Sequence, residues 1–212
     1  MNGHANAEGL KLIERLEAVV DLKESPLEDL LELGQLYIEP CHREAEAISL
    51  FETVLSRDHN NACAKFWLAY CCLHYLMDQD ALRRATTLLE SVIESGDTQY
   101  TAAAYMLLAE VLEEKGSLST DKQIQLLEAS VSSEPNWVYN RQSLAWAYME
   151  AGRHSDALEH INQALANVKT PEPEWSFTKR NFEESITGRI GHRVTERLES
   201  TLEKVQEKIK SR

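Results

Sequence analysis

Apolar residues between positions 140 and 168 follow the period of two short amphipathic helices. Leu144, Ala145 and Tyr148 fall on one face of the first helix, and Ala157 and Ile161 fall on one face of the second. The sequence Ala-Gly-Arg at 151–153 separates them and indicates a tight turn. The segment is therefore predicted to form a helical hairpin.

The same placement of apolar and small residues occurs three more times upstream, which is typical of a repeat architecture. The first helix of each copy carries a Leu-Gly or Leu-Ala pair, at Leu33-Gly34, Leu68-Ala69 and Leu108-Ala109. The second helix of each copy carries a matching pair, at Ala47 and Phe51, Ala85 and Leu89, and Gln123 and Leu127.

This pattern resembles the tetratricopeptide repeat (TPR), a 34-residue helix-turn-helix with W-x2-L-G-x2-Y, then A-x3-F, then P. The resemblance covers residues 26–171 and implies four repeats at about 26–61, 62–99, 100–137 and 138–171. It implies an all-α fold, an α-solenoid of about four TPR-like helix-turn-helix repeats with capping helices. Small residues such as Gly34 and Ala145 suit points where two helices approach closely, because larger side chains would force them apart.

The chain departs from the TPR pattern at several positions. Gln123 replaces one small Ala, and the Trp position holds Leu30, Lys65, Tyr105 and Arg141. We expect the extra residues of the longer repeats to lie in turns, notably in "LMDQDALRR", since insertions are tolerated at the surface. An ordinary antiparallel helix bundle is the alternative fold, although amphipathic spacing alone does not explain the recurrent Gly and Ala positions.

Both ends of the chain are predicted to cap the array. Residues 1–25 contain one helix, and Ser25 and Pro26 are predicted to be the N-cap and first residue of the next. Residues 172–212 are predicted to form a C-terminal helical cap, with a short helix around 176–187 and a final helix after Gly191. The apolar stripe of that final helix either covers the last repeat or serves as a coiled-coil or partner helix; it consists of Val194, Leu198, Leu202, Val205 and Ile209.

Composition supports an ordered helical protein and excludes a membrane-spanning one. The chain is 43% hydrophobic and 27% charged, with few Gly and Pro residues. No apolar run approaches the ~18 residues that a membrane helix needs, and the first ten residues lack the features of a signal peptide. We therefore expect a cytoplasmic protein, with Cys41, Cys63, Cys71 and Cys72 as reduced thiols.

The net charge of −13 lies in the body of the chain. Residues 1–170 hold 27 acidic side chains against 13 Lys and Arg, whereas residues 171–212 hold 8 against 9. Such a body repels phosphate groups, so nucleic acid is not expected as a partner unless the near-neutral tail alone contacts it. We instead expect a protein or peptide partner that has a basic segment.

Motifs that carry catalysis or bind phosphate are missing from the sequence. It contains no glycine-rich phosphate loop, GxSxG, HExxH or paired CxxC. Cys63, Cys71, Cys72 and His74 could be considered as metal ligands, but Cys72 occupies a buried repeat position, which favours small apolar filler. We expect no metal, no cofactor and no enzymatic activity.

The TPR resemblance implies that the first helix of each repeat lines a concave groove. Positions one turn either side of the core positions are aromatic and acidic, the composition of binding hot spots. The predicted partner-binding residues are Glu28, Gln35, Phe66, Tyr70, His74, Glu110, Glu113, Tyr139, Gln142, Trp146 and Glu150. Alternatively, Phe66, Tyr70 and Trp146 pack between repeats as core.

The sequence therefore predicts a non-catalytic protein- or peptide-binding module whose groove binds a basic partner. Such a module could be an assembly subunit, an adaptor or an acidic inhibitor of a basic effector. The TPR version that holds the C-terminal carboxylate of chaperones uses Lys, Arg and Asn, and the predicted groove contains no Lys or Arg. The alternative function is a structural oligomerisation module, with a homodimer formed through the C-terminal helix.

Overall fold

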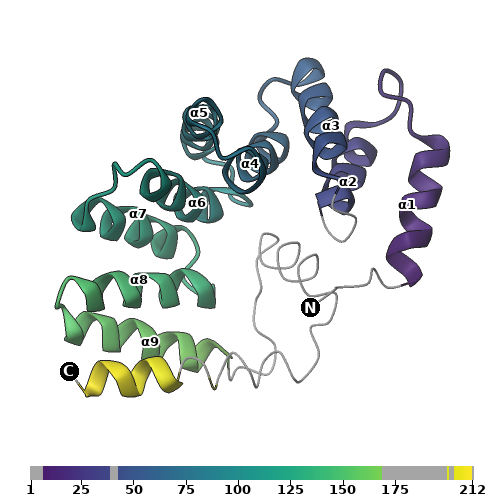
Figure 1. Ribbon diagram of the computed structural model, residues 1–212. Coiled ribbons are helices and arrows are strands. Elements are labelled where there is room, and N and C mark those ends of the chain that lie inside the picture. Colours follow the sequence, from purple (N-terminus) through teal and green to yellow (C-terminus); the bar gives the residue numbers. More distant parts are fainter. Residues whose placement is uncertain (1–6, 39–42, 169–199, 201–202, 212) are drawn as a thin grey trace.

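The computed structural model describes residues 7–38, 43–168, 200 and 203–211, and its described elements are all helical (Figure 1). In chain order they are α1 (Ala7–Val19), α2 (Leu27–Ile38), α3 (Glu44–Arg57), α4 (Ala62–Cys71), the π-helix η1 (Cys72–Leu76), α5 (Gln79–Ser95), α6 (Thr101–Glu114), α7 (Thr120–Ser133), α8 (Val138–Glu150) and α9 (His154–Val168). Residues 203–210 form a further helix. None of the described helices is long and apolar enough to cross a membrane.

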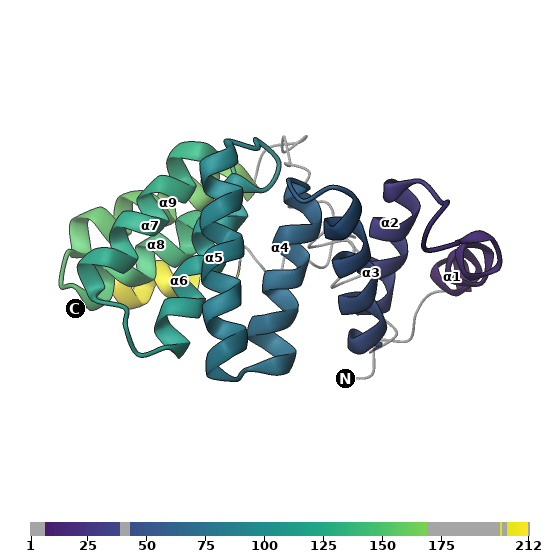
Figure 2. The same ribbon diagram turned by 90° about the horizontal axis from the view of Figure 1, so that it is seen from above.

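The helices pair as α2 with α3, α4 with α5, α6 with α7 and α8 with α9, and the hairpins follow one another along an arc (Figure 1). The view from above shows the same succession from α1 to α5, whereas α7, α8 and α9 overlap in that view (Figure 2). In Figure 1, α2, α4 and α6 lie on the inner side of the arc and α3, α5 and α7 on its outer side. This is the all-α solenoid of TPR-like hairpins that the sequence predicts.

Local sequence signals fix where several helices begin and end. Asn61, Asp78 and Ser119 are N-caps whose side chains accept a hydrogen bond from a backbone N–H of the first turn. Gly96 ends α5 in the left-handed conformation, with φ of 66°. Ser25 does not follow the prediction: its hydroxyl accepts from the N–H of Asp21 at 2.8 Å, and α2 begins at Leu27.

Small residues allow the paired helices to approach closely. Gly34 of α2 faces the ring of Phe51 on α3, and both residues are buried. The alanines at the corresponding repeat positions are also buried, namely Ala47, Ala69, Ala85, Ala109, Ala145 and Ala157. Side-chain volume at these positions therefore sets the spacing between helices.

The core consists of two apolar clusters that meet near α6 and α8. One runs from Ile13 on α1 to Trp137, and the other from Ile124 on α7 to Ile209 in the last helix. Met106 and Tyr139 pack against both clusters, so the array is continuous. A repeat array of this kind gains most of its stability from contacts between neighbours.

Both described ends pack on the array. Ile13 and Leu16 of α1 are buried at one end, and Val205 and Ile209 are buried at the other. The predicted helix at 176–187, Cys41, and the stripe residues Val194, Leu198 and Leu202 lie outside the described residues.

The segment "LMDQDALRR" is mostly helical, so its prediction as a turn is wrong. Helix α5 already begins at Gln79, and the turn consists of Met77 and Asp78. The preceding residues 72–76 form a π-helix, the usual result of inserting a residue into an α-helix. The insertion is thus absorbed by a π-turn and longer helices.

Candidate functional site

Aromatic side chains follow α4 and η1 from the core to the surface. Phe66 contacts Trp67 with ring centroids 5.5 Å apart, and Trp67 contacts Tyr70 at 5.6 Å. Tyr70 then contacts His74 at 4.2 Å and Tyr75 at 6.2 Å. Tyr70 is half-buried and His74 is exposed, so the outer end of this row is accessible to a partner.

Phe66, by contrast, does not face a groove. Its side chain is only 2% exposed, and its ring lies 5.3 Å from that of Tyr100 at the start of α6. The structure therefore places Phe66 in the core, the alternative that the sequence left open.

The second part of the candidate site is a group of carboxylates on α6. Glu110 and Glu113 are exposed, and no described Lys or Arg forms an ion pair with either. Desolvation raises the pKa of Glu110, and the charge of Glu113 acts in the same direction. Desolvation lowers the pKa of His74, while the charge of Glu114, which follows Glu113 on α6, opposes that shift. We call Tyr70, His74, Glu110 and Glu113 the α4–α6 face.

The exposed apolar ridge at the end of η1 could not be recognised from the sequence. Tyr75, Leu76 and Met77 are 36%, 46% and 60% exposed, and among the described residues only Val19 and Leu22 are other large apolar side chains as open to solvent. Met77 adopts a left-handed backbone, with φ of 55° and ψ of 9°, and its N–H donates to Cys72 O. The π-helix changes the direction in which these residues point, and the α-helical period of the sequence does not predict that change.

The predicted site residues of α2 belong to a different helix from those of the α4–α6 face. Glu28 is exposed, and Gln35 is half-buried, with its Nε2 donating to Leu31 O at 3.2 Å and to Cys63 Sγ at 3.7 Å. Tyr100 donates to the same sulfur at 3.0 Å. Gln35 is thus engaged in joining α2 to α4.

The predicted residues of α8 are covered to different degrees. Glu150 is exposed, whereas Tyr139, Gln142 and Trp146 are half-buried. The ammonium group of Lys208, in the last helix, lies 4.9 Å from the centroid of the Trp146 ring. Trp146 is therefore already in contact with a cation of its own chain.

Burial disfavours the thiolate forms of the described cysteines. Cys71 and Cys72 are buried, and desolvation raises the pKa of Cys63 and of Cys71 to about 12. Within the described part of the chain, no group of three or more His, Cys, Asp or Glu side chains is placed to hold a metal ion.

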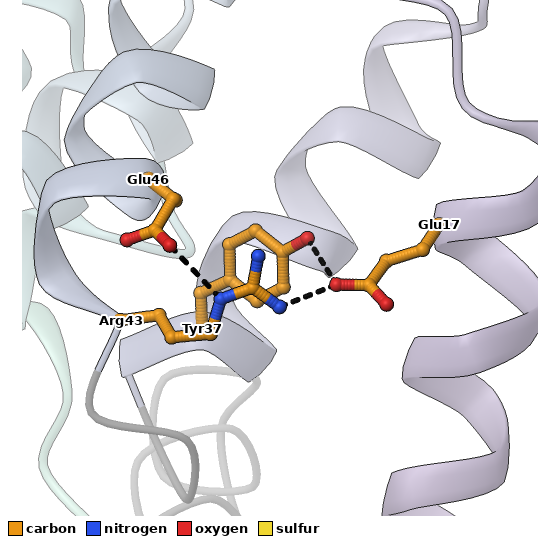
Figure 3. Close-up of polar contacts among 4 residues, drawn as sticks. All are labelled: Glu17, Tyr37, Arg43 and Glu46. Atoms are coloured by element: carbon orange, nitrogen blue, oxygen red, sulfur yellow. Dashed lines mark hydrogen bonds and ion pairs between the residues drawn. The ribbon is translucent and has the colours of Figure 1, made fainter.

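A charged cluster that the sequence did not reveal joins α1 to the first hairpin (Figure 3). Tyr37 donates to Glu17 Oε1 at 2.7 Å, and Arg43 pairs with both Glu17 and Glu46. The Arg43 guanidinium also lies 3.9 Å from the Tyr37 ring centroid. Beside the cluster is a hollow of about 410 Å³ whose lining includes Val20, Leu22, Leu33 and Leu50.

These contacts shift the ionisation of the cluster. Hydrogen bonds from Tyr37 and Arg43 lower the pKa of Glu17, and burial together with the bond to Glu17 raises the pKa of Tyr37 to about 12. Each charged group of the cluster has a partner within it, so the cluster fastens α1 to the first hairpin.

Comparison with solved structures identifies the fold. A crystal structure of MamA is 26% identical, with a TM-score of 0.56, and the match covers 73% of this chain and 85% of that one. MamA from Desulfovibrio magneticus RS-1 (41-end) is 18% identical, with a TM-score of 0.59, over 78% of this chain and 89% of that one. No family model matches the chain, and no curated protein matches it. The chain has the TPR-like helical repeat fold of these structures.

Proposed function

We propose that this chain is a non-catalytic protein-binding module that holds a basic segment of a partner protein on the α4–α6 face. The observation that carries the proposal is the pair Glu110 and Glu113, which are exposed and form no ion pair with a described Lys or Arg, on the helix whose Glu114 acts electrostatically on His74. The TPR-like neighbours support a role in protein interaction. A partner that fits is an assembly subunit or a basic effector, for which this chain acts as adaptor or acidic inhibitor.

Electrostatics and burial have separate roles in this proposal. The carboxylates attract a basic segment at long range, and the repulsion between Glu110 and Glu113 is relieved when a Lys or Arg binds between them. Tyr70 and His74 provide the apolar and aromatic area that holds the bound segment. The exposed ridge Tyr75, Leu76 and Met77 extends that area at the same end of the row.

The described part of the C-terminal helix does not favour oligomerisation as the main function. Val205 and Ile209 pack into the core cluster of their own chain, with exposed fractions of 5% and 3%. A homodimer through Val205 and Ile209 would have to remove both side chains from that cluster, whereas the other residues of the predicted stripe lie outside the described residues.

The test is affinity capture from native lysate with three forms of the full chain. These are the wild type, the double variant Glu110→Gln, Glu113→Gln, and a control, Glu90→Gln, Glu94→Gln, which removes two exposed charges from α5. We expect a basic protein that salt elutes from the wild type and the control and that the first double variant does not retain. Equal capture by all three forms would show that the α4–α6 face is not the site.

A further inference from the structure

The last helix places a lysine on a residue that belongs to the repeat pattern of the binding face. Trp146 follows Leu144-Ala145 as Tyr70 follows Leu68-Ala69 and Glu110 follows Leu108-Ala109, so the three residues occupy one repeat position. Lys208 lies over the Trp146 ring at 4.9 Å, a distance at which an ammonium group is attracted to an aromatic face.

Three further contacts fix the helix of residues 203–210 on the last hairpin. Val205 and Ile209, four residues apart, are buried with the apolar side chains of α8 and α9. Gln206 Nε2 donates to Asn162 Oδ1 of α9 at 2.6 Å. The helix thus presents two apolar residues and one lysine to a surface that includes Trp146, which we call the Trp146 seat.

These contacts are few and partly open to water. Among residues 203–211, Val205 and Ile209 are the two buried side chains, whereas the Gln206–Asn162 bond and the Lys208 side chain are exposed. A partner helix with the same pattern that buries more apolar surface would compete with it for the Trp146 seat.

We propose that the Trp146 seat is a binding site for an amphipathic partner helix with an apolar residue, a lysine three positions later and an apolar residue after it, and that residues 203–210 occupy it in the free protein. The proposal rests on the proposed function, because it assigns a helical form and a lysine to the basic segment of the partner. Binding then requires displacement of the chain's own helix, which lowers the apparent affinity of the free protein.

A labelled peptide with the sequence of residues 200–212 tests the seat directly. It is titrated into the full chain as wild type, as Ile209→Ser, and as Ile209→Ser combined with Trp146→Leu, which retains an apolar side chain but removes the aromatic face. We expect Ile209→Ser to bind the peptide at least about ten-fold more tightly than the wild type, because its own helix competes less. The Trp146→Leu change should weaken binding about three-fold or more, as loss of a partly exposed cation–π contact predicts.

Two lysine variants test the contact between Lys208 and Trp146 without changing a buried side chain, as Ile209→Ser does. Lys208→Gln and Lys204→Gln remove the same charge from the same helix, but only Lys208 has a described contact with Trp146. When the full chain carries the change, Lys208→Gln should bind the wild-type peptide more tightly than Lys204→Gln does. When the peptide carries the change, the Lys208→Gln peptide should bind the Ile209→Ser chain more weakly than the Lys204→Gln peptide does. Indistinguishable binding of these variants, or of Ile209→Ser and the wild type, overturns the proposal.

Two further results separate this proposal from its alternatives. If the wild type is a dimer and Ile209→Ser is a monomer by light scattering, the seat holds the helix of a second copy and the proposal is wrong. The peptide assay needs no cellular partner, so a failed capture on the α4–α6 face contradicts the proposed function without changing the peptide result. Conversely, suppose that a captured basic protein binds Ile209→Ser and the wild type equally. That result would contradict displacement of the chain's own helix and leave the proposed function unchanged.

Discussion

Gly34 lies so close to Phe51 that a Cβ atom built on the glycine would come within 2.7 Å of Phe51 Cε1 and 2.8 Å of Cζ. The ring of Phe51 is fully buried and therefore has little room to move. The two residues belong to α2 and α3, so this contact sets the distance between the helices of the first hairpin.

Gly34→Ala should therefore destabilise the protein by about 1–3 kcal/mol, the usual cost of overpacking. Alanine is better than glycine in a helix by about 1 kcal/mol, and we expect the clash to exceed that gain. Urea unfolding gives the free energy, and Phe51→Leu in the Gly34→Ala background should recover part of the loss. A variant at least as stable as the wild type would show that the hairpin adjusts freely.

Met77→Gly should stabilise the protein, in contrast to Gly34→Ala. Met77 has φ of 55° and is 60% exposed, so its side chain contributes little core packing while its backbone is strained. Glycine adopts this conformation without a steric cost, and we expect a gain of up to about 1 kcal/mol in the free energy of unfolding. Met77→Ala removes the same side chain and retains the strain, so its midpoint should not exceed that of the wild type.

The repeat pattern predicted the fold because it is local. Gly34 and Phe51 lie on the two helices of one hairpin, as Ala145 and Ala157 do in the last hairpin. The sizes of such paired side chains must match wherever two helices of a hairpin pack together. The pattern could not locate Lys208 on Trp146, since these residues are far apart in the chain and no periodicity links them. The Glu17–Arg43 pair was missed for the same reason.

The register also predicted groove positions without predicting their exposure. Phe66 and Tyr70 are one turn apart on α4, yet Phe66 is buried against Tyr100 and Tyr70 is half-exposed. The difference depends on how far α6 overlaps α4, which the packing of the hairpins determines. The π-helix before Met77 adds a change of direction that an α-helical register does not contain.

Asn140 fixes the end of α7, and Asn140→Asp should be strongly destabilising. Its fully buried side chain donates to Ser130 O at 3.2 Å and to Glu134 O at 2.9 Å. A carboxylate cannot donate and would face two carbonyl oxygens, which should cost about 1–3 kcal/mol or more at pH 7. The loss should be smaller at pH 4, where a protonated Asp can donate one bond. Gln142→Glu on the same helix is the control.

The attachment of α1 should depend on pH through Glu17 and Tyr37. The pKa of Glu17 is lowered in the folded state, so its contribution is present above the pKa of the unfolded chain and is lost as pH falls. The pKa of Tyr37 is raised to about 12, so its contribution is complete below pH ~10 and is lost as pH rises through 12. Hydrogen exchange of α1, corrected for intrinsic rates, should show greatest protection between these limits. In Glu17→Gln the protection should be lower, and its acid dependence should disappear.

Glu110 provides the sharpest test of the α4–α6 face, because stability and binding should change in opposite directions. Its pKa is raised by desolvation and by Glu113, so folding disfavours its charged form. Such a group stabilises the fold fully below its unfolded pKa, and this advantage is lost as pH rises through its folded pKa. Glu110→Gln should therefore unfold at higher denaturant concentration than the wild type at pH 7, with the difference shrinking towards pH 4.

A carboxylate that costs stability at neutral pH is what a site for a basic partner requires, since the bound cation removes the cost. The captured partner should accordingly bind Glu110→Gln more weakly at pH 7, mainly through slower association, and the wild-type rate should fall as salt approaches ~0.15 M, where screening acts over about 8 Å. Glu90→Gln, on the outer helix α5, is the matched control and should change neither property. If Glu110→Gln is more stable but binds the partner as well as the wild type does, the carboxylate has no part in recognition. The partner's contact must then be sought on the ridge of Tyr75, Leu76 and Met77 or at the Trp146 seat.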